Sequence, residues 1–138
     1  MSANTNPIYS IAPDFQWGTT VLTAANTAKD GTGTVLTVLT ADAINGGRIE
    51  KIRFRAAGTN VATVARVFIN NGATNATAAN NILYDEITLP ATTLSETSAL
   101  ANQEIILNVS LPPGYKINVT IGTAVAAGYY ISSNGGKY

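Results

Sequence analysis

The sequence contains no histidine and no cysteine among its 138 residues. These two side chains supply most nucleophile and base pairs that work near neutral pH, and cysteine also supplies disulfides. Their absence excludes thiol enzymes, hydrolase triads built on histidine, and disulfide staples. Variants built on Ser and Lys remain, but the chain has no Ser-x-x-Lys spacing. We therefore expect a non-enzymatic protein whose function lies in its surfaces.

Charge is also scarce, because charged residues make up 12% of the chain while hydrophobic residues make up 46%. An ordinary apolar content with little charge indicates a packed fold. The eight basic and eight acidic side chains give a formal net charge of zero. A neutral chain repels its own copies weakly and has no overall field for polyanions, which favours self-association and argues against a nucleic-acid partner.

Long apolar runs are missing as well, since no run approaches the roughly 18 residues that span a bilayer. The segment 1–7 has neither the basic nor the apolar part of a secretory signal, so we expect no export signal and no membrane partner. Residues 1–14 are polar and include Pro7 and Pro13. We expect an extended N-terminal arm over 1–14, followed by one domain over 15–138.

Short runs rich in Thr, Val and Ile, separated by turn residues, are the most frequent pattern. The predicted strands cover residues 15–23, 34–40, 48–57, 61–69, 82–89, 105–111, 115–121 and 128–132. Only 92–102 leaves room for a helical turn. About eight strands with this spacing predict an all-β, single-domain β-sandwich or jelly roll.

Several local patterns refine this prediction. Ile49 is out of step with Ile52, which predicts a β-bulge near Glu50. The run 61–69 is apolar on both faces, as in a central strand, and the Asn-rich stretch 70–81 predicts an exposed loop. The two strands on either side of 112–114 should form a hairpin or a corner between paired strands.

Carboxylates offer little for catalysis. Asp85, Glu86 and Glu104 are the candidates for a pair that cleaves a glycosidic bond, but adjacent strand residues point to opposite faces. Asp30 stands before a glycine in a turn and has too few neighbouring oxygen ligands for Ca²⁺. We expect no metal, no cofactor and no small-molecule substrate.

The basic residues are unevenly distributed, because five of the eight lie within one short stretch: Arg48, Lys51, Arg53, Arg55 and Arg66. One interpretation is a solvated outer strand that charge keeps from aggregating. The other is a stripe that docks on an acidic partner surface, where arginine binds carboxylates through two parallel hydrogen bonds.

The aromatic residues gather near the two ends of the chain. Phe15 and Trp17 share one face of a predicted strand and are expected in the core. Tyr129, Tyr130 and Tyr138 fit equally well as core residues or as anchors of a partner interface.

The segments 67–72, 86–92 and 111–123, which read VFINNG, EITLPAT and LPPGYKINVTIGT, resemble small virion proteins of tailed bacteriophages. In size and texture the chain is most similar to capsid decoration, or cement, proteins, which are jelly-roll or β-sandwich domains. The likeness covers roughly residues 48–138.

This resemblance implies a cement protein on the outside of the phage head, made in the host cytoplasm and bound as a homodimer or homotrimer to the major capsid protein. It also implies that the arm 1–14 and the loop 70–81 reach toward neighbouring subunits and become ordered there. No binding residues carry over from the family. A tail or fibre module that binds a host glycan or protein is the alternative, because one fold serves many functions.

Overall fold

The computed structural model describes residues 10–138, which form eight strands and one short 3₁₀ helix. The strands are β1 (Ala12–Trp17), β2 (Leu36–Thr40), β3 (Gly47–Ala56), β4 (Thr63–Asn70), β5 (Asn81–Leu89), β6 (Asn102–Leu111), β7 (Lys116–Ile121) and β8 (Tyr129–Lys137). The helix η1 (Ala78–Asn80) lies in the connection from β4 to β5.

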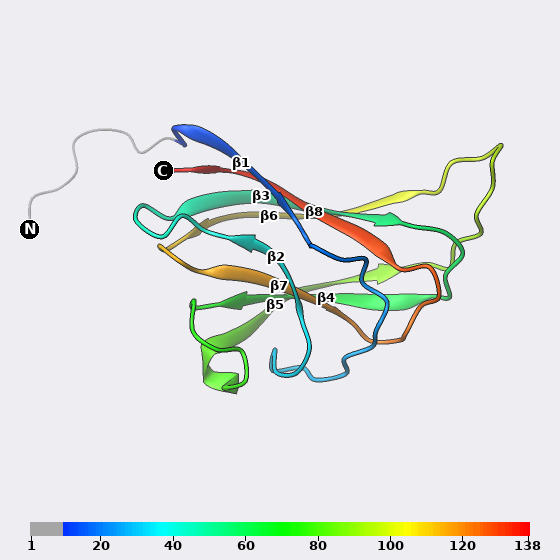
Figure 1. Ribbon diagram of the computed structural model, residues 1–138, viewed down its shortest axis with the longest axis horizontal. Helices are drawn as coiled ribbons and strands as arrows, with labels where there is room; N and C mark the ends of the chain where they lie inside the picture. The colour runs from blue at the N-terminus through cyan, green and yellow to red at the C-terminus, as the bar shows by residue number, and fades with distance from the viewer. Residues whose placement is uncertain (1–9) are drawn as a thin grey trace, which may run out of the picture.

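The strands form two antiparallel sheets that pack face to face (Figure 1). Sheet A has the order β1-β8-β3-β6, and sheet B has the order β2-β7-β4-β5. The pairs β1·β8, β2·β7, β3·β6 and β4·β5 are those of one long hairpin rolled into two layers. This is the arrangement of an eight-stranded jelly roll, so the predicted fold class is confirmed.

The core lies between the sheets and follows the alternation of the sequence. Ile52 and Phe54 of β3 are fully buried, as are Val67 of β4 and Val119 of β7. Burial of each such side chain contributes about 1.5–3 kcal/mol to stability. The predicted bulge is also present, because the pairing of β3 with both of its neighbours shifts between Ile49 and Lys51.

Two expectations about the bounds of the strands are wrong. The first strand begins at Ala12 inside the expected arm and ends at Trp17, so the domain starts earlier than predicted. The final strand extends through Lys137. The stretch 92–102, which left room for a helical turn, contains an isolated β-bridge at Thr92, bends at 96–98 and the first residue of β6. Of the two interpretations left open for 112–114, the structure shows the corner, because the strands on either side lie in different sheets and do not pair with each other.

The two long sides of the sandwich differ. On the β1 and β2 side, the Gln16 side chain donates a hydrogen bond to the Thr40 carbonyl at 3.0 Å and accepts one from the Thr40 amide at 3.0 Å. The Ser133 hydroxyl adds a bond to the Val38 carbonyl at 3.1 Å. On the opposite side, β5 and β6 are edge strands of their sheets. The sandwich is therefore linked by hydrogen bonds along the β1 and β2 side.

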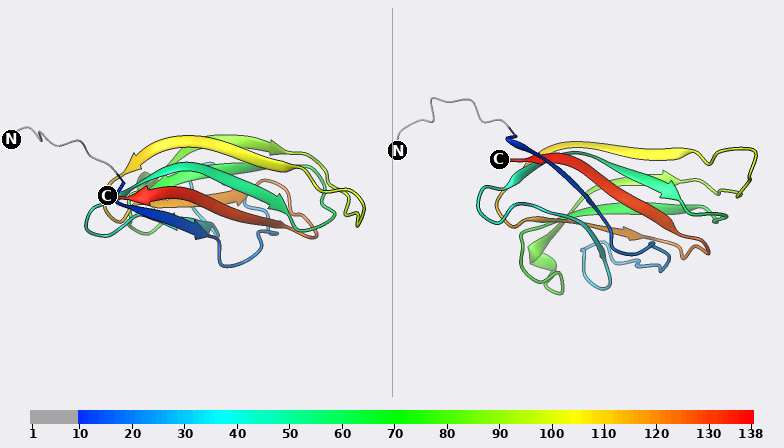
Figure 2. Two further views of the ribbon diagram at one scale, coloured as in Figure 1. Left: turned by 90° about the horizontal axis from the view of Figure 1, so that it is seen from above. Right: turned by 45° about the horizontal axis from the view of Figure 1, so that its top comes forward.

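The segments 26–33 and 71–80 lie on the side of sheet B that faces away from sheet A (Figures 1 and 2). Asparagine side chains join them. Asn75 donates to the carbonyl oxygens of Gly31 (3.1 Å) and Gly33 (2.8 Å), and Asn81 donates to that of Asp30 (3.1 Å). The loop 70–81 is therefore ordered within the chain itself, contrary to what the resemblance implies. The remainder of the expected reaching arm, 1–9, lies outside the described residues.

Candidate docking face

The outer face of sheet A carries aromatic and basic side chains in rows that run across the strands. In one row, Trp17 of β1 pairs with Ser132 of β8, which pairs with Arg53 of β3 and then Glu104 of β6. The neighbouring row is built the same way, with Phe15 on β1, Asn134 on β8 and Lys51 on β3. We name this surface the aromatic-basic face and define it by the residues Phe15, Trp17, Tyr130, Lys51, Arg53 and Arg55.

Phe15 and Trp17 are therefore not core residues, and their predicted burial is wrong. Their side chains are 59% and 64% exposed, while the intervening Gln16 and the preceding Asp14 point inward. The reason is local, because Gln16 must face β2 to bind its backbone and alternation then sends both aromatic side chains outward. Their ring centroids lie 5.9 Å apart with the planes tilted by 49°.

Lys51 and Arg53 share one acidic partner on the neighbouring edge strand. The Glu104 carboxylate lies 2.8 Å from the Arg53 guanidinium and 3.4 Å from the Lys51 ammonium. The hydrogen bond from Arg53 holds the pKa of Glu104 below its ordinary value, and the Lys51 charge adds to this effect. Exposed pairs of this kind contribute little to stability, about 0–1 kcal/mol. One carboxylate therefore sits beside two cations, so this part of the face stays net positive.

Within the described part of the chain, Arg55 has no carboxylate among its hydrogen-bond partners. Its guanidinium donates to the Asn102 side-chain oxygen at 2.6 Å and to the Leu100 carbonyl at 3.0 Å. Tyr130, its register partner on β8, is 60% exposed. Arg48 lies at the other end of β3, beside Tyr138, whose hydroxyl is 2.7 Å from that of Ser110.

Arg66 does not belong to this group. It lies on β4 in sheet B, so the predicted stripe of five cations divides into four on sheet A and one on the opposite sheet. Its guanidinium lies 3.7 Å from the Glu86 carboxylate and packs against Gly122. Sequence proximity placed Arg66 with the others, but β3 and β4 belong to different layers.

The three tyrosines have different environments. Of the two interpretations left open for Tyr129, the structure shows the core one, because this residue is 2% exposed. Burial raises the pKa of its hydroxyl. Tyr130 lies on the aromatic-basic face, and Tyr138 is half-buried beside Ser110.

The acidic residues do not converge on one site. Asp85 and Glu86 lie on β5 of sheet B, whereas Glu104 lies on β6 of sheet A. Asp30 accepts hydrogen bonds from the amide and hydroxyl of Thr32, which lower its pKa and identify it as a turn residue. Over residues 10–138 no cluster of three or more potential metal ligands is found. Within the same range, no helix is long and apolar enough to cross a membrane.

Sequence reasoning missed the interleaving of aromatic and basic side chains, because it compares positions along one strand only. The aromatic residues of β1 and the cations of β3 are far apart in sequence, and β8 brings them to one surface (Figure 2). The sequence did contain a signal for the outward position of the aromatic residues, because the polar residues Asp14 and Gln16 alternate with Phe15 and Trp17 along β1. Comparison with known proteins adds nothing to this geometry, because no family model, curated protein or solved structure matches the chain.

Proposed function

We propose that this protein is a non-enzymatic structural protein of a phage virion that binds the outside of the head. It acts there as a capsid decoration, or cement, protein and stabilises contacts between major capsid subunits. The aromatic-basic face of sheet A is the surface that docks. The resemblance of the segments between Val67 and Thr123 supplies the virion setting, and the surface of sheet A supplies the mode of attachment.

The observation that carries the proposal is that the other segments of the chain leave most of the aromatic-basic face of sheet A uncovered. Within residues 10–138, the Ser10 side chain lies over Gly136 at the end of β8. Apart from this end, no described segment crosses the outside of sheet A when it is viewed from above, and β6, β3, β8 and β1 lie open in that order (Figure 2). Tryptophan, tyrosine and arginine are the residue types that contribute most to protein-protein interfaces. Here Trp17, Tyr130 and Arg53 lie on the outer face of one sheet, and the apolar surface of both aromatic side chains is exposed to solvent. Exposed apolar surface of this kind marks interaction sites.

The first test counts copies and asks where they are. Imaging and quantitative mass spectrometry of purified particles should find hundreds of copies on the head, bound to the major capsid protein. A handful of copies at the tail would contradict the cement role.

The second test changes the face. Arg53→Glu combined with Arg55→Glu reverses two exposed charges, so the isolated fold should stay within about 1 kcal/mol of the parent. Particles incubated with this variant should retain far fewer copies of it than particles incubated with the parent protein retain of the parent. Lys29→Glu, an exposed charge reversal on the loop beyond sheet B, is the matched control and should leave attachment unchanged. Equal retention of both variants would show that the cations of β3 only solvate an outer strand.

The alternative, a tail or fibre module that binds a host glycan, is favoured by one observation. Ser132 and Asn134 place hydrogen-bonding groups between the exposed aromatic side chains and the cations, and such mixed surfaces suit polar ligands. A glycan array separates the two functions. Saturable binding to a defined glycan, lost in Trp17→Ala, together with few copies on the head, would favour the alternative.

A further inference from the structure

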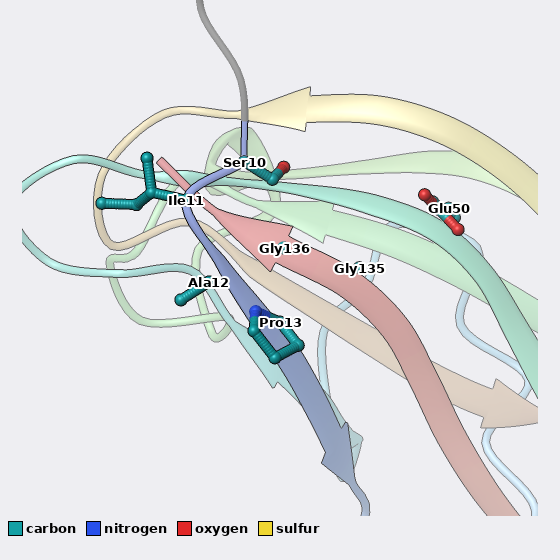
Figure 3. Close-up of a pocket in the computed structure, with 7 residues that line it drawn as sticks. All are labelled: Ser10, Ile11, Ala12, Pro13, Glu50, Gly135 and Gly136. Carbon is teal, nitrogen blue, oxygen red and sulfur yellow. The ribbon is translucent and has the colours of Figure 1, made fainter.

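Two hollows follow one another along β8 on the outside of sheet A. The first is lined by Phe15, Lys51, Arg53, Ser132 and Asn134. The second lies farther along β8, beside Gly135 and Gly136, with Pro13 of β1 on one side and Glu50 of β3 on the other (Figure 3). Ser10 closes its far end, because the Ser10 side chain lies over Gly136. We name this line of two hollows the β8 groove.

The walls of the groove differ in chemistry. The β1 wall is apolar and consists of Pro13, Phe15 and Trp17, which share the outward face of that strand. The β3 wall is basic where Lys51 and Arg53 face it. Two strand spacings separate these walls, or about 10 Å, which leaves room for one extended chain.

The floor is formed by β8, on which Ser132 and Gly136 are small, while the Asn134 side chain is exposed between the two hollows. Ser132, Asn134 and Gly136 are its outward positions, and they lie between the two walls in register. From Ser132 to Gly136 the groove is about 13 Å long, which matches roughly four residues of an extended peptide.

Charge along the β3 wall is graded. Lys51 and Arg53 share only Glu104, which lies on their far side, on β6. A carboxylate in the groove can therefore approach the same two cations from the β8 side. At the other end, Glu50 lines the hollow beside the glycines and brings negative charge there. Acidic groups are favoured at the Arg53 end and disfavoured at the Glu50 end.

We infer that the β8 groove binds an extended segment of a partner protein in which acidic residues alternate with apolar ones. In an extended chain, successive side chains point to opposite sides. A segment lying along β8 thus directs apolar side chains to Phe15 and Trp17 and carboxylates to Lys51 and Arg53. This inference rests on the proposed function in one respect, namely that the outer face of sheet A is the docking surface.

The tilt of the aromatic rings favours a peptide over a polymer that binds by stacking. Bases of single-stranded nucleic acid stack on aromatic faces in succession. The Phe15 and Trp17 planes are inclined by 49° at a centroid distance of 5.9 Å, so they pack against each other and do not form one flat platform. An aliphatic side chain can pack against either ring without such a platform.

Trp17 makes a direct test possible, because it is the only tryptophan in the chain and it forms part of the wall. The probe is a capped peptide of about seven residues in which glutamate alternates with valine and leucine, a length set by the groove plus its flanks. Titration of the full-length protein with this peptide should shift the Trp17 emission to shorter wavelength and saturate. A peptide of the same composition with its glutamates grouped at one end should bind at least tenfold more weakly, because its side chains cannot match both walls.

Variants assign the binding to the groove. Phe15→Ala and Arg53→Gln should each raise the peptide Kd about fivefold to tenfold, since they remove one wall contact each. Tyr84→Ala and Lys29→Gln remove an exposed aromatic and an exposed cation elsewhere, and should leave the Kd unchanged. Glu104→Gln should lower the Kd a few-fold, because it frees Lys51 and Arg53 from their present partner. A merely structural role of these residues would not produce changes of opposite sign.

Three results would overturn the inference. These are no shift with the alternating peptide, equal affinity for the grouped peptide, and saturable binding of oligothymidylate or polygalacturonate in place of the peptide. Particle attachment separates this failure from that of the proposed function. If copies remain on the head and Arg53→Glu with Arg55→Glu releases them, but the peptide does not bind, then the face docks by another chemistry and only the groove assignment fails.

Discussion

The outer faces of the two sheets have opposite relations to the rest of the chain. Sheet A presents Phe15, Trp17 and Tyr130 to solvent, each more than half exposed. On sheet B, Phe68 also points away from the core, in register with Asn118, yet it is 0% exposed. The chain thus encloses Phe68 on one face and leaves three aromatic residues exposed on the other, while the exposed aromatic residue of sheet B, Tyr84, lies on its edge strand β5.

The difference lies in the connections. The segments 26–33 and 71–80 both lie on the sheet B side, and the side chains of Asn75 and Asn81 bind the two segments together. Asparagine suits this task, because its amide can donate to and accept from backbone groups that lack strand partners. The asparagine side chains therefore complete sheet B from within the chain, while four of the eight cations lie on β3 of sheet A, which is left open.

The strongest test of this comparison removes one aromatic side chain from each face. Phe68→Ala should lower the free energy of unfolding by about 3–5 kcal/mol, as for a large side chain lost from a packed interior. Trp17→Ala should change it by no more than about 1 kcal/mol, because the side chain is 64% exposed. Denaturant unfolding followed by circular dichroism measures both. Similar losses of unfolding free energy in the two variants would mean that the aromatic side chains of both faces contribute equally to the stability of the fold.

An asparagine pair sharpens the comparison at smaller scale. Asn81 donates to the Asp30 and Asn75 carbonyls and accepts from the Asn70 amide at 2.7 Å, so Asn81→Ala should cost about 1–3 kcal/mol. Asn134→Ala on the bare face should stay within about 0.5 kcal/mol. The backbone amides of 26–33 and 71–80 should also exchange their hydrogens faster in Asn81→Ala, but not in Asn134→Ala. Unchanged exchange in those segments would contradict the role of this residue as a link between the loops.

Period-two alternation predicted the strands well where one face is core, as in β3, and parity alone located the bulge at Glu50. It failed at β1, where hydrophobicity assigned Phe15 and Trp17 to the interior. The inward positions there are polar because Gln16 has a backbone to bind on β2, a contact that no local pattern encodes.

The candidate site was predictable only in part for a similar reason. The cations of β3 form a stripe that is visible in the sequence, but their aromatic neighbours come from β1, which β8 separates from β3 in the sheet. Strand order is a property of the whole jelly roll. The same limit explains Arg66, which is near in sequence and belongs to the other layer.

Acid titration provides the smallest contrast between the faces. Asp30 on the sheet B side and Glu104 on sheet A both have a pKa below the ordinary value, through Thr32 in one case and through Arg53 and Lys51 in the other. A carboxyl whose pKa is lowered by folding stabilises the native state above its unfolded pKa, and this contribution is lost as the pH falls through the folded value. The melting temperature should therefore decline as the pH is lowered below about 4.5, the ordinary value for glutamate.

Single variants divide this decline between the two faces. Asp30→Asn removes a carboxylate that receives two hydrogen bonds from Thr32 in its turn, at 3.1 Å and 2.6 Å, and should flatten the acid limb. Glu104→Gln removes an exposed ion pair, and salt screens the contribution of such a pair to stability. The effect of this variant on the decline of the melting temperature in acid should therefore disappear in about 1 M NaCl. The measurement is the melting temperature from pH 3 to pH 7 at low and high salt. The prediction is wrong if the effect of Asp30→Asn disappears in high salt while that of Glu104→Gln persists. That result would mean that the carboxylate held by local hydrogen bonds is on sheet A and the solvated one is among the loops of sheet B.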